Sequence, residues 1–249
     1  MVSSLLLQGS RVKVNHAARR PIVMSWREIS WPGCGRVLLR QVSLDSFDRE
    51  RSRDAILSAE ELRRASHFRR ERDRRRFVAG RTFVRECLGE LLGVGPDRIV
   101  FGAGAFGRPE ILAPATSLSF SLAHAGGQAL LAVASNGRVG VDIEEQHAAP
   151  NAEALAPRAL APEELEQFHA RPAGERESFF LERWTAKEAL LKAAGIGFSC
   201  DPASLALARD PGGFFTGSGE PRIAGLRARL VDAGPGWIAA LAIEAEEAA

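Results

Sequence analysis

Cysteine is scarce in this chain, and long apolar runs are absent. The 249 residues include three cysteines, Cys34, Cys87 and Cys200, with no metal-ligand spacing among them. Isolated thiols in odd number predict a reducing compartment, not a disulfide framework or a zinc site. No apolar run approaches the ~20 residues of a membrane span, and Leu5–Leu7 is too short for the core of a signal peptide. These absences predict a soluble, cytoplasmic protein.

The motifs of several large enzyme classes are missing as well. There is no P-loop, no dinucleotide-binding glycine fingerprint, no Gly-x-Ser-x-Gly turn and no zinc pattern. The chain is long enough for one large domain or two small ones, and its 45% hydrophobic residues can form real cores. A function therefore has to be sought outside those classes.

Charge is distributed unevenly along the chain. Residues 141–249 contain 18 acidic and 10 basic residues, a net charge of −8. Because the whole chain has a net charge of +2, residues 1–140 have a net charge of +10. This asymmetry predicts an anionic ligand held mainly by the N-terminal half. Between Arg49 and Glu90, 13 arginines face 8 acids, which suits phosphate binding, a nucleic-acid surface or a solvated helix with ion pairs. The interleaved acids and the lack of aromatics within Arg69–Arg76 argue against nucleic acid.

Apolar periodicity and turn residues predict strands and helices from about residue 37 onward. Ser58–Glu61 has the capping-box pattern, so a helix is expected to begin there and run through the Arg-rich segment. Asn136-Gly137 predicts a hairpin between two strands. Residues 1–30 lack periodicity and are interpreted as a weakly structured lead-in, with Met24 as a second candidate start. The expected strands are 37–42, 99–101, 118–122, 129–133, 139–144, 223–231 and 237–243, and further helices are expected at 77–92, from about 161, and around 184–192.

The strand at Gly140–Glu144 places two carboxylates on one face. Period 2 directs Asp142 and Glu144 away from Val139, Val141 and Ile143. Hard cations such as Mg²⁺ take one or two carboxylates together with phosphate oxygens. Glycine at position 140, on the same face, predicts room for a bulky group. An exposed strand face with two solvated acids is the alternative.

A helical segment, Trp184–Lys192, carries a second polar face. Trp184, Glu188 and Lys192 recur at four-residue spacing and share that face, whereas Ala186, Ala189, Leu190 and Ala193 form an apolar stripe. The alternative is an ordinary surface pair of Glu188 and Lys192, worth roughly 0.3–0.5 kcal/mol. The large aromatic ring on the same face favours a helix half inserted into a cleft.

Together, Gly-Val-Asp-Ile-Glu at 140–144 and Trp-Thr-Ala-Lys-Glu-Ala-Leu-Leu-Lys at 184–192 resemble the paired signature of the 4′-phosphopantetheinyl transferases of Sfp type. The resemblance extends over roughly residues 37–243 and includes Gly107-Arg108-Pro109 and the Phe120–His124 strand. It implies an α+β fold of two similar α/β lobes with pseudo-two-fold symmetry. The lobes would be 31–135 and 136–249, and coenzyme A would lie between them in a monomer.

The resemblance also implies roles for individual residues. Asp142, Glu144 and Glu188 would hold Mg²⁺ against the pyrophosphate of coenzyme A. Glu188 would act as the general base and Lys192 would stabilise the developing charge. The implied contacts to coenzyme A are Arg64, Arg72, Arg76, Gly107, Arg108, Ala123, His124, Asp142 and Lys192.

The implied reaction transfers 4′-phosphopantetheine from coenzyme A to a serine of an apo acyl or peptidyl carrier protein and releases 3′,5′-ADP. No nucleic acid or membrane takes part, and the chain does not indicate which carrier or pathway is served. Two positions depart from the family pattern, because Ala123 replaces a serine and Arg108 replaces a lysine. A catalytically silent coenzyme A-binding protein and an Arg-rich nucleic-acid binder are the alternatives, and the intact signature argues against both.

Overall fold

The structure is a computed structural model that describes residues 25–31, 36–47, 55–146 and 152–244. The N-terminal half contains an antiparallel sheet in the order β1-β2-β6-β5 and a separate two-stranded ribbon, β3-β4. Its strands are β1 Arg27–Ile29, β2 Val37–Ser43, β3 Val100–Ala103, β4 Pro109–Ala113, β5 Ser119–Ala125 and β6 Gln128–Ala134, and its helices are α1 Ala59–Ser66 and α2 Glu71–Leu92.

The C-terminal half contains a five-stranded antiparallel sheet in the order β7-β11-β10-β9-β8. Its strands are β7 Val139–Glu145, β8 Ala206–Arg209, β9 Phe214–Ser218, β10 Leu226–Val231 and β11 Trp237–Glu244, and its helices are α3 Ala152–Ala159, α4 Pro162–His169 and α5 Ala173–Ala194. No helix of the described chain is long and apolar enough to cross a membrane.

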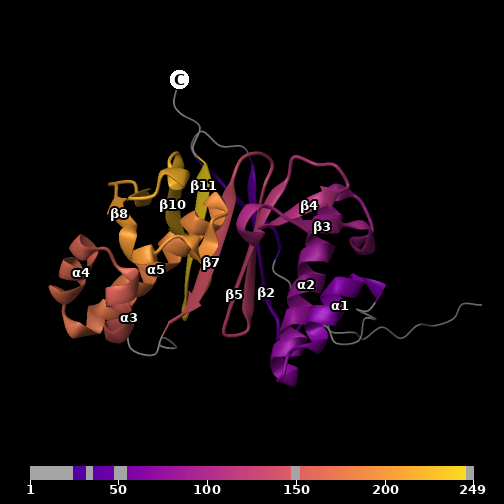
Figure 1. The fold of residues 1–249 in the computed structure, drawn as a ribbon, viewed down its shortest axis with the longest axis horizontal. Coiled ribbons are helices and arrows are strands. Elements are labelled where there is room, and N and C mark those ends of the chain that lie inside the picture. The colour runs from indigo at the N-terminus through magenta and orange to yellow at the C-terminus, as the bar shows by residue number, and fades with distance from the viewer. Residues whose placement is uncertain (1–24, 32–35, 48–54, 147–151, 245–249) are drawn as a thin grey trace, which may run out of the picture.

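The two sheets lie face to face between two helical layers. In β6, Leu130 packs between the sheets, whereas its neighbour Leu131 packs on the α2 side. In β11, Leu241 likewise packs between the sheets and Ala240 packs under α5. The layers therefore follow the order helix, sheet, sheet, helix, and Figure 1 shows helices at both ends with the strands between them.

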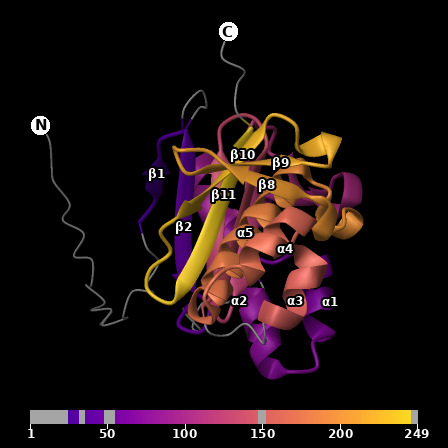
Figure 2. The same cartoon turned by 90° about the vertical axis from the view of Figure 1, so that its left-hand side faces the viewer.

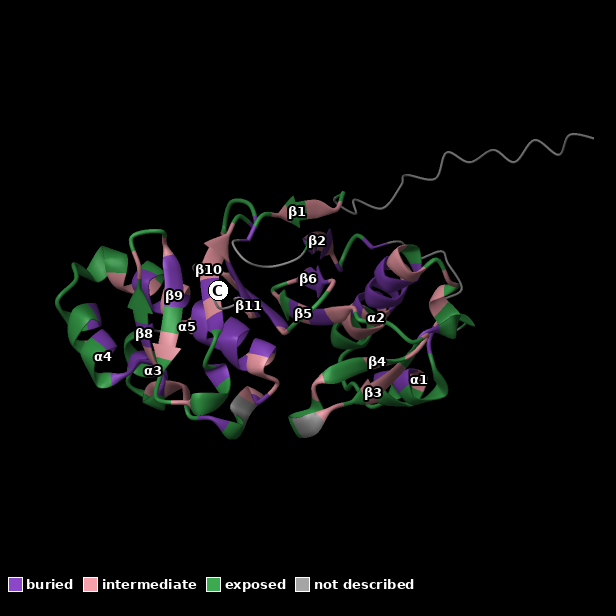
Figure 3. Cartoon of the chain, turned by 90° about the horizontal axis from the view of Figure 1, so that it is seen from above, coloured by how far each residue is buried: buried purple, intermediate pink, exposed green. Residues whose placement is uncertain are grey.

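Two further views support this arrangement. Figure 2 shows β1 and β2 along the side of the molecule away from α3 and α4. Figure 3 shows the buried residues concentrated in α2, α5 and the central strands. The shared core between the sheets joins the two halves, because it includes Leu39 of β2 and Val141 of β7.

Every predicted strand is present, and both signature segments lie on the predicted kinds of element. The capping box at the start of α1 is confirmed, because Glu61 N–H donates to Ser58 Oγ and Ser58 N–H donates to Glu61 Oε2. The sequence did not reveal β1, β4, β8, β9 or α3. Most of the expected lead-in, including Met24, lies outside the described residues, and its last part contains β1. The lobe boundary near residue 135 remains a proposal.

Two local predictions are wrong. Asn136-Gly137 does not close a hairpin, because β6 pairs with β2 and β5 whereas β7 pairs with β11. The partner of β7 is decided by the burial of both its faces and not by the turn, because one face packs against the other sheet and the opposite face packs against α5. The helix from Ser58 also does not run through the Arg-rich segment. It ends at Ser66, and α2 begins at Glu71, whose carboxylate pairs with Arg74 and Arg75 in the first turn.

Candidate active site

The polar faces that residue spacing predicted for β7 and α5 meet in the structure. Lys192 Nζ lies 2.5 Å from Asp142 Oδ1, and Trp184 Nε1 donates to Glu144 Oε1 at 2.9 Å. Neither strand carboxylate is therefore a solvated surface group, and Lys192 pairs with Asp142 instead of Glu188. The apolar stripe of α5 packs onto the sheet below, with Ala186, Ala189, Leu190 and Ala193 fully buried.

Gly140 fits this contact in a different way from the one we expected. A Cβ atom at this position would lie 2.0 Å from Ala189 O and 2.4 Å from Ala193 N. The room that the glycine leaves is filled by the backbone of α5 and not by a ligand. Close approach of helix and strand brings Lys192 within reach of Asp142.

Two carboxyl groups at this contact, those of Asp142 and Glu188, are buried and have raised pKa values. Burial raises the pKa of Asp142 to about 7, and Lys192 only partly opposes this effect. Burial also raises the pKa of Glu188, with Lys192 again acting in the opposite direction. Glu188 has no hydrogen-bond partner within the described residues, which suits a group that accepts a proton from a substrate.

These residues fit a divalent cation. Asp142 Oδ2 is buried and lacks a hydrogen-bond partner in the described structure, so it is an acceptor in need of a positive ligand. Carboxylate oxygens are the donors that Mg²⁺ prefers. Among the described residues no three acidic, histidine or cysteine side chains already form a ready metal cluster. The three-carboxylate set of Asp142, Glu144 and Glu188 therefore remains a prediction.

A cavity of about 720 Å³ lies next to this contact. Its volume is within the range of small-molecule sites. Lys192 links the two features, because it lines the cavity and pairs with Asp142. The charged and titratable lining residues are Arg64, Asp73, Arg76, Arg81, Arg108, His124 and Lys192, so cations predominate.

Most of the predicted coenzyme A contacts line this cavity. Arg64, Arg76, Gly107, Arg108, His124 and Lys192 are all in its wall. Burial, followed by the charges of Lys192 and Arg76, lowers the pKa of His124 and keeps its imidazole neutral near pH 7. Arg76 is held by two hydrogen bonds to Asp45, at 2.8 and 2.6 Å.

Three predicted contacts do not line the cavity. Asp142 is one of them, and its ion pair with Lys192 joins it to the cavity wall. Arg72 is exposed and its guanidinium lies 3.8 Å from Asp45. Ala123 is 2% exposed and packs in the core between the sheets, on the face of β5 opposite His124. A serine hydroxyl at position 123 would point into that core, so the alanine removes no cavity donor.

Sequence inspection missed the aromatic part of the cavity wall. Phe68, Phe77 and Phe106 line it beside Arg81. Asp73, Phe77 and Arg81 recur at four-residue spacing along α2, so helical periodicity could have placed them on one face. Phe106 could not have been found, because its position depends on an unusual backbone φ of 58°.

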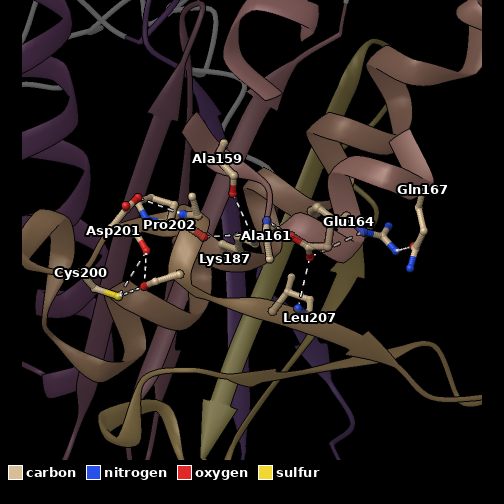
Figure 4. A network of polar contacts seen from close by, with 12 residues as sticks. Ala159, Ala161, Glu164, Gln167, Lys187, Cys200, Asp201, Pro202 and Leu207 are labelled. Carbon is tan, nitrogen blue, oxygen red and sulfur yellow. Dashed lines mark hydrogen bonds and ion pairs between the residues drawn. The ribbon is translucent and has the colours of Figure 1, made fainter. Parts of the chain in front are cut away.

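Lys187, which follows Ala186 in the signature, has its own buried network on the other side of α5 (Figure 4). Its Nζ lies 2.5 Å from Glu164 Oε2 and donates to Ala159 O and Pro202 O at 2.7 and 2.9 Å. Glu164 also accepts the Ala161 N–H. Burial lowers the pKa of Lys187, while Glu164 favours its charged form. The network fastens α3, α4 and the segment before β8 to the back of the helix that carries Glu188.

Comparisons with known proteins show the family of this chain. A family model described as the 4′-phosphopantetheinyl transferase superfamily matches residues 138–242, and one described as 4′-phosphopantetheinyl transferase, N-terminal, matches residues 46–136. A 4′-phosphopantetheinyl transferase of Bacillus pumilus is 30% identical over 164 residues, which cover 64% of this chain and 69% of the relative. The chain therefore belongs to the 4′-phosphopantetheinyl transferase superfamily.

Other relatives are similar over a smaller share of their length. A putative 4′-phosphopantetheinyl transferase of Synechocystis is 36% identical over 146 residues, and one of Nostoc is 38% identical over 148 residues. Each match covers 58% of this chain, and the chain spans 59% and 62% of these two relatives. The structure of a holo-[acyl-carrier-protein] synthase from Thermotoga maritima aligns with a TM-score of 0.37 and 23% identity over 44% of this chain and 64% of that one.

Proposed function

We propose that this protein transfers the 4′-phosphopantetheine arm of coenzyme A to a serine of an apo acyl or peptidyl carrier protein. One observation carries the proposal. A buried acid with an unpartnered oxygen, Asp142, is joined through Lys192 to a cavity lined by cations. Phosphoryl transfer requires mainly positioning and neutralisation of negative charge, and this arrangement supplies both.

The cavity would bind the nucleotide part of coenzyme A. Arg64, Arg76 and His124 are the proposed contacts for its phosphates, since guanidinium groups match phosphate oxygens and a neutral imidazole can donate one hydrogen bond. Arg76 is pre-positioned by Asp45, so less side-chain entropy is lost when it binds. The excess of basic residues in the N-terminal half is consistent with this role.

Asp142, Glu144 and Glu188 would hold Mg²⁺, which supplies charge neutralisation at the pyrophosphate when it is bound. The ammonium group of Lys192 would then leave Asp142 and bind a pyrophosphate oxygen, because the carboxylate and the pyrophosphate are both anionic partners for it. Glu188 would accept the proton of the carrier serine as its oxygen forms the new bond to phosphorus. The bond from that phosphorus to the bridging oxygen breaks, and 3′,5′-ADP leaves.

The two alternatives have lost their support. A catalytically silent coenzyme A-binding protein was suggested by the missing serine at position 123, but Ala123 lies in the core and not at the cavity. A nucleic-acid surface required unpaired arginines, whereas Arg63, Arg74 and Arg75 pair with acids of their own helices. Both halves contribute to one cavity, so we expect a monomer to be active.

Intact-mass spectrometry of apo carrier proteins tests the proposal. The carriers are incubated with the full chain, coenzyme A and Mg²⁺, with and without EDTA. We expect a mass gain of one phosphopantetheine group that disappears when EDTA removes the metal. Binding of coenzyme A by calorimetry without any mass gain, across fatty-acid, polyketide and nonribosomal-peptide carriers, would overturn the proposal in favour of a binding protein.

A further inference from the structure

Arg108 joins the two halves of the molecule through backbone carbonyls. It follows the turn after β3 and immediately precedes β4, so it belongs to the N-terminal half. Its Nη1 donates to Ala193 O at 2.5 Å, and its Nη2 donates to Val139 O at 3.0 Å. Both acceptors belong to the C-terminal half, the first at the end of α5 and the second at the start of β7.

The Ala193 carbonyl needs an external donor. It is among the last four carbonyls of α5, which have no intrahelical N–H partner. The N–H groups that close this helix end, those of Gly195 and Ile196, donate to Lys192 O and Leu191 O. A cation at this end also interacts favourably with the helix dipole. Gly195 leaves room for it, since a Cβ there would lie 3.2 Å from Arg108 Cδ.

The two acceptors adjoin the two members of the central ion pair. Ala193 directly follows Lys192, and Val139 precedes Asp142 by three residues on the same strand. A side chain that holds both carbonyls therefore fixes the spacing between the helix that carries the lysine and the strand that carries the acid. The planar guanidinium can donate in two directions at once, which a lysine ammonium on its flexible stem does less rigidly.

Among the described residues, no carboxylate pairs with Arg108 and draws its guanidinium away from the two carbonyls. Burial is the main influence on its guanidinium and lowers its pKa, although an arginine in a protein remains charged. Arg108 also lines the cavity. Two roles are therefore chemically available, a direct contact to a phosphate and a hold on the backbone of the C-terminal half.

We propose that Arg108 is a positioning residue, which fastens the end of α5 and the start of β7 to the N-terminal half and so sets Lys192 against Asp142. Its effect on the reaction rests on the transfer proposed above, whereas its effect on the helix end does not. The residue acts on the reaction through the two backbone carbonyls that it holds.

The test compares Arg108→Met and Arg108→Lys with the unchanged chain. In the ligand-free protein, hydrogen exchange of the amides around the end of α5 should be faster in Arg108→Met, with Arg108→Lys in between. In transfer assays, kcat should fall about tenfold in Arg108→Met, the size expected for losing hydrogen bonds to a charged group. The factor should be the same for coenzyme A and 3′-dephospho-coenzyme A, and KM should rise by less.

Arg138→Met is the matched control. Arg138 also donates to two carbonyls, Arg222 O and Ala224 O, but none of its hydrogen bonds within the described residues goes to α5. Its replacement should leave the exchange of the α5 end and the kcat unchanged. Unaltered exchange in Arg108→Met, or a loss confined to the KM of coenzyme A and absent with the dephospho substrate, would overturn the proposal. Failure of the unchanged chain to transfer would instead count against the proposed function, and the exchange comparison would still decide the role of Arg108.

Discussion

The two halves of the molecule are versions of one unit, and only one of them carries the acids of the proposed site. A shift of 102 positions places α2 on α5 and β2 on β7, with identical bounds. Both helices have 22 residues and end at a glycine with positive φ, Gly93 at 66° and Gly195 at 71°. The order β2-β6-β5 in one sheet corresponds to β7-β11-β10 in the other.

The halves also share a buried acid that fastens a short helix to the long one. Glu61 accepts the N–H at the start of α1 and pairs with Arg85 of α2 at 2.8 Å. Glu164 accepts the N–H at the start of α4 and pairs with Lys187 of α5 at 2.5 Å. Arg85 and Lys187 are themselves 102 positions apart. This part of the unit has a structural role in both halves.

The difference lies on the opposite face of the long helices. Asp142 pairs with Lys192 at 2.5 Å, and 102 positions earlier Arg40 pairs with Glu90 at the same distance with the charges reversed. Glu188 corresponds to another glutamate, Glu86, but Glu144 corresponds to Val42. The two strand acids of the proposed cation site therefore have no acidic counterparts in the N-terminal half, although the two halves share the same scaffold.

The largest expected effect is a difference in kcat between variants of the two corresponding glutamates, Glu188 and Glu86. Glu188→Gln should lower kcat for phosphopantetheine transfer by about 10²–10⁴-fold, because the amide cannot accept the serine proton. Glu86→Gln, the matched change in the N-terminal half, should leave kcat within about twofold, since no strand acid stands opposite it. Steady-state assays on an apo carrier measure both. Equal losses in the two variants would show that the halves share the chemistry.

A second comparison concerns the buried acids behind the helices. Lys187→Met leaves the Glu164 carboxylate buried without its main cation and should lower the free energy of unfolding by roughly 3–5 kcal/mol. Arg85→Met should lower the free energy of unfolding by less, because the guanidinium of Arg81 remains 2.6 Å from the Glu61 carboxylate and still balances its charge. Denaturant unfolding measures both variants.

The double variant Lys187→Met with Glu164→Gln serves as the control for this comparison. It removes the unpaired charge and keeps an oxygen for the Ala161 N–H, so part of the lost stability should return. No recovery in the double variant would mean that Lys187 acts by packing and not by charge.

The sequence alone predicted which side chains share a face of β7 and of α5, but it does not display the internal repeat. Period 2 in β7 correctly grouped Asp142 with Glu144, and four-residue spacing in α5 correctly grouped Glu188 with Lys192, because both patterns depend only on local geometry. The contact between the two groups depends on how the helix packs on the sheet, which neither pattern contains. Few identities, such as Glu86 and Glu188, survive between the halves, so the two similar lobes were expected only from the family resemblance. The Asn136-Gly137 hairpin failed because sheet partners are decided by packing between distant segments.

Contacts made by backbone atoms also could not be predicted from the sequence. The fit of Gly140 against the α5 backbone has no pattern in the sequence, since a glycine can equally leave room for a ligand. The same holds for the carbonyl partners of Arg108, which become neighbours only when the two halves pack together.

The smallest expected effect comes from reversing the Arg40–Glu90 ion pair, which gives the N-terminal half the charge order found in the C-terminal half. Arg40→Asp with Glu90→Lys recreates the order of the Asp142–Lys192 pair at the corresponding positions. The new pair loses the stacking of Arg40 on Trp26 and the hydrogen bond from Trp26 to Glu90, so we expect a loss of roughly 1–2 kcal/mol in unfolding free energy. Titration with Mn²⁺ should still give one site per chain, because Val42 provides no oxygen where Glu144 stands in the other half. A second bound ion in the swapped variant would mean that one strand acid with the helix glutamate suffices, and that the difference between the halves rests on the reversed Arg40–Glu90 pair.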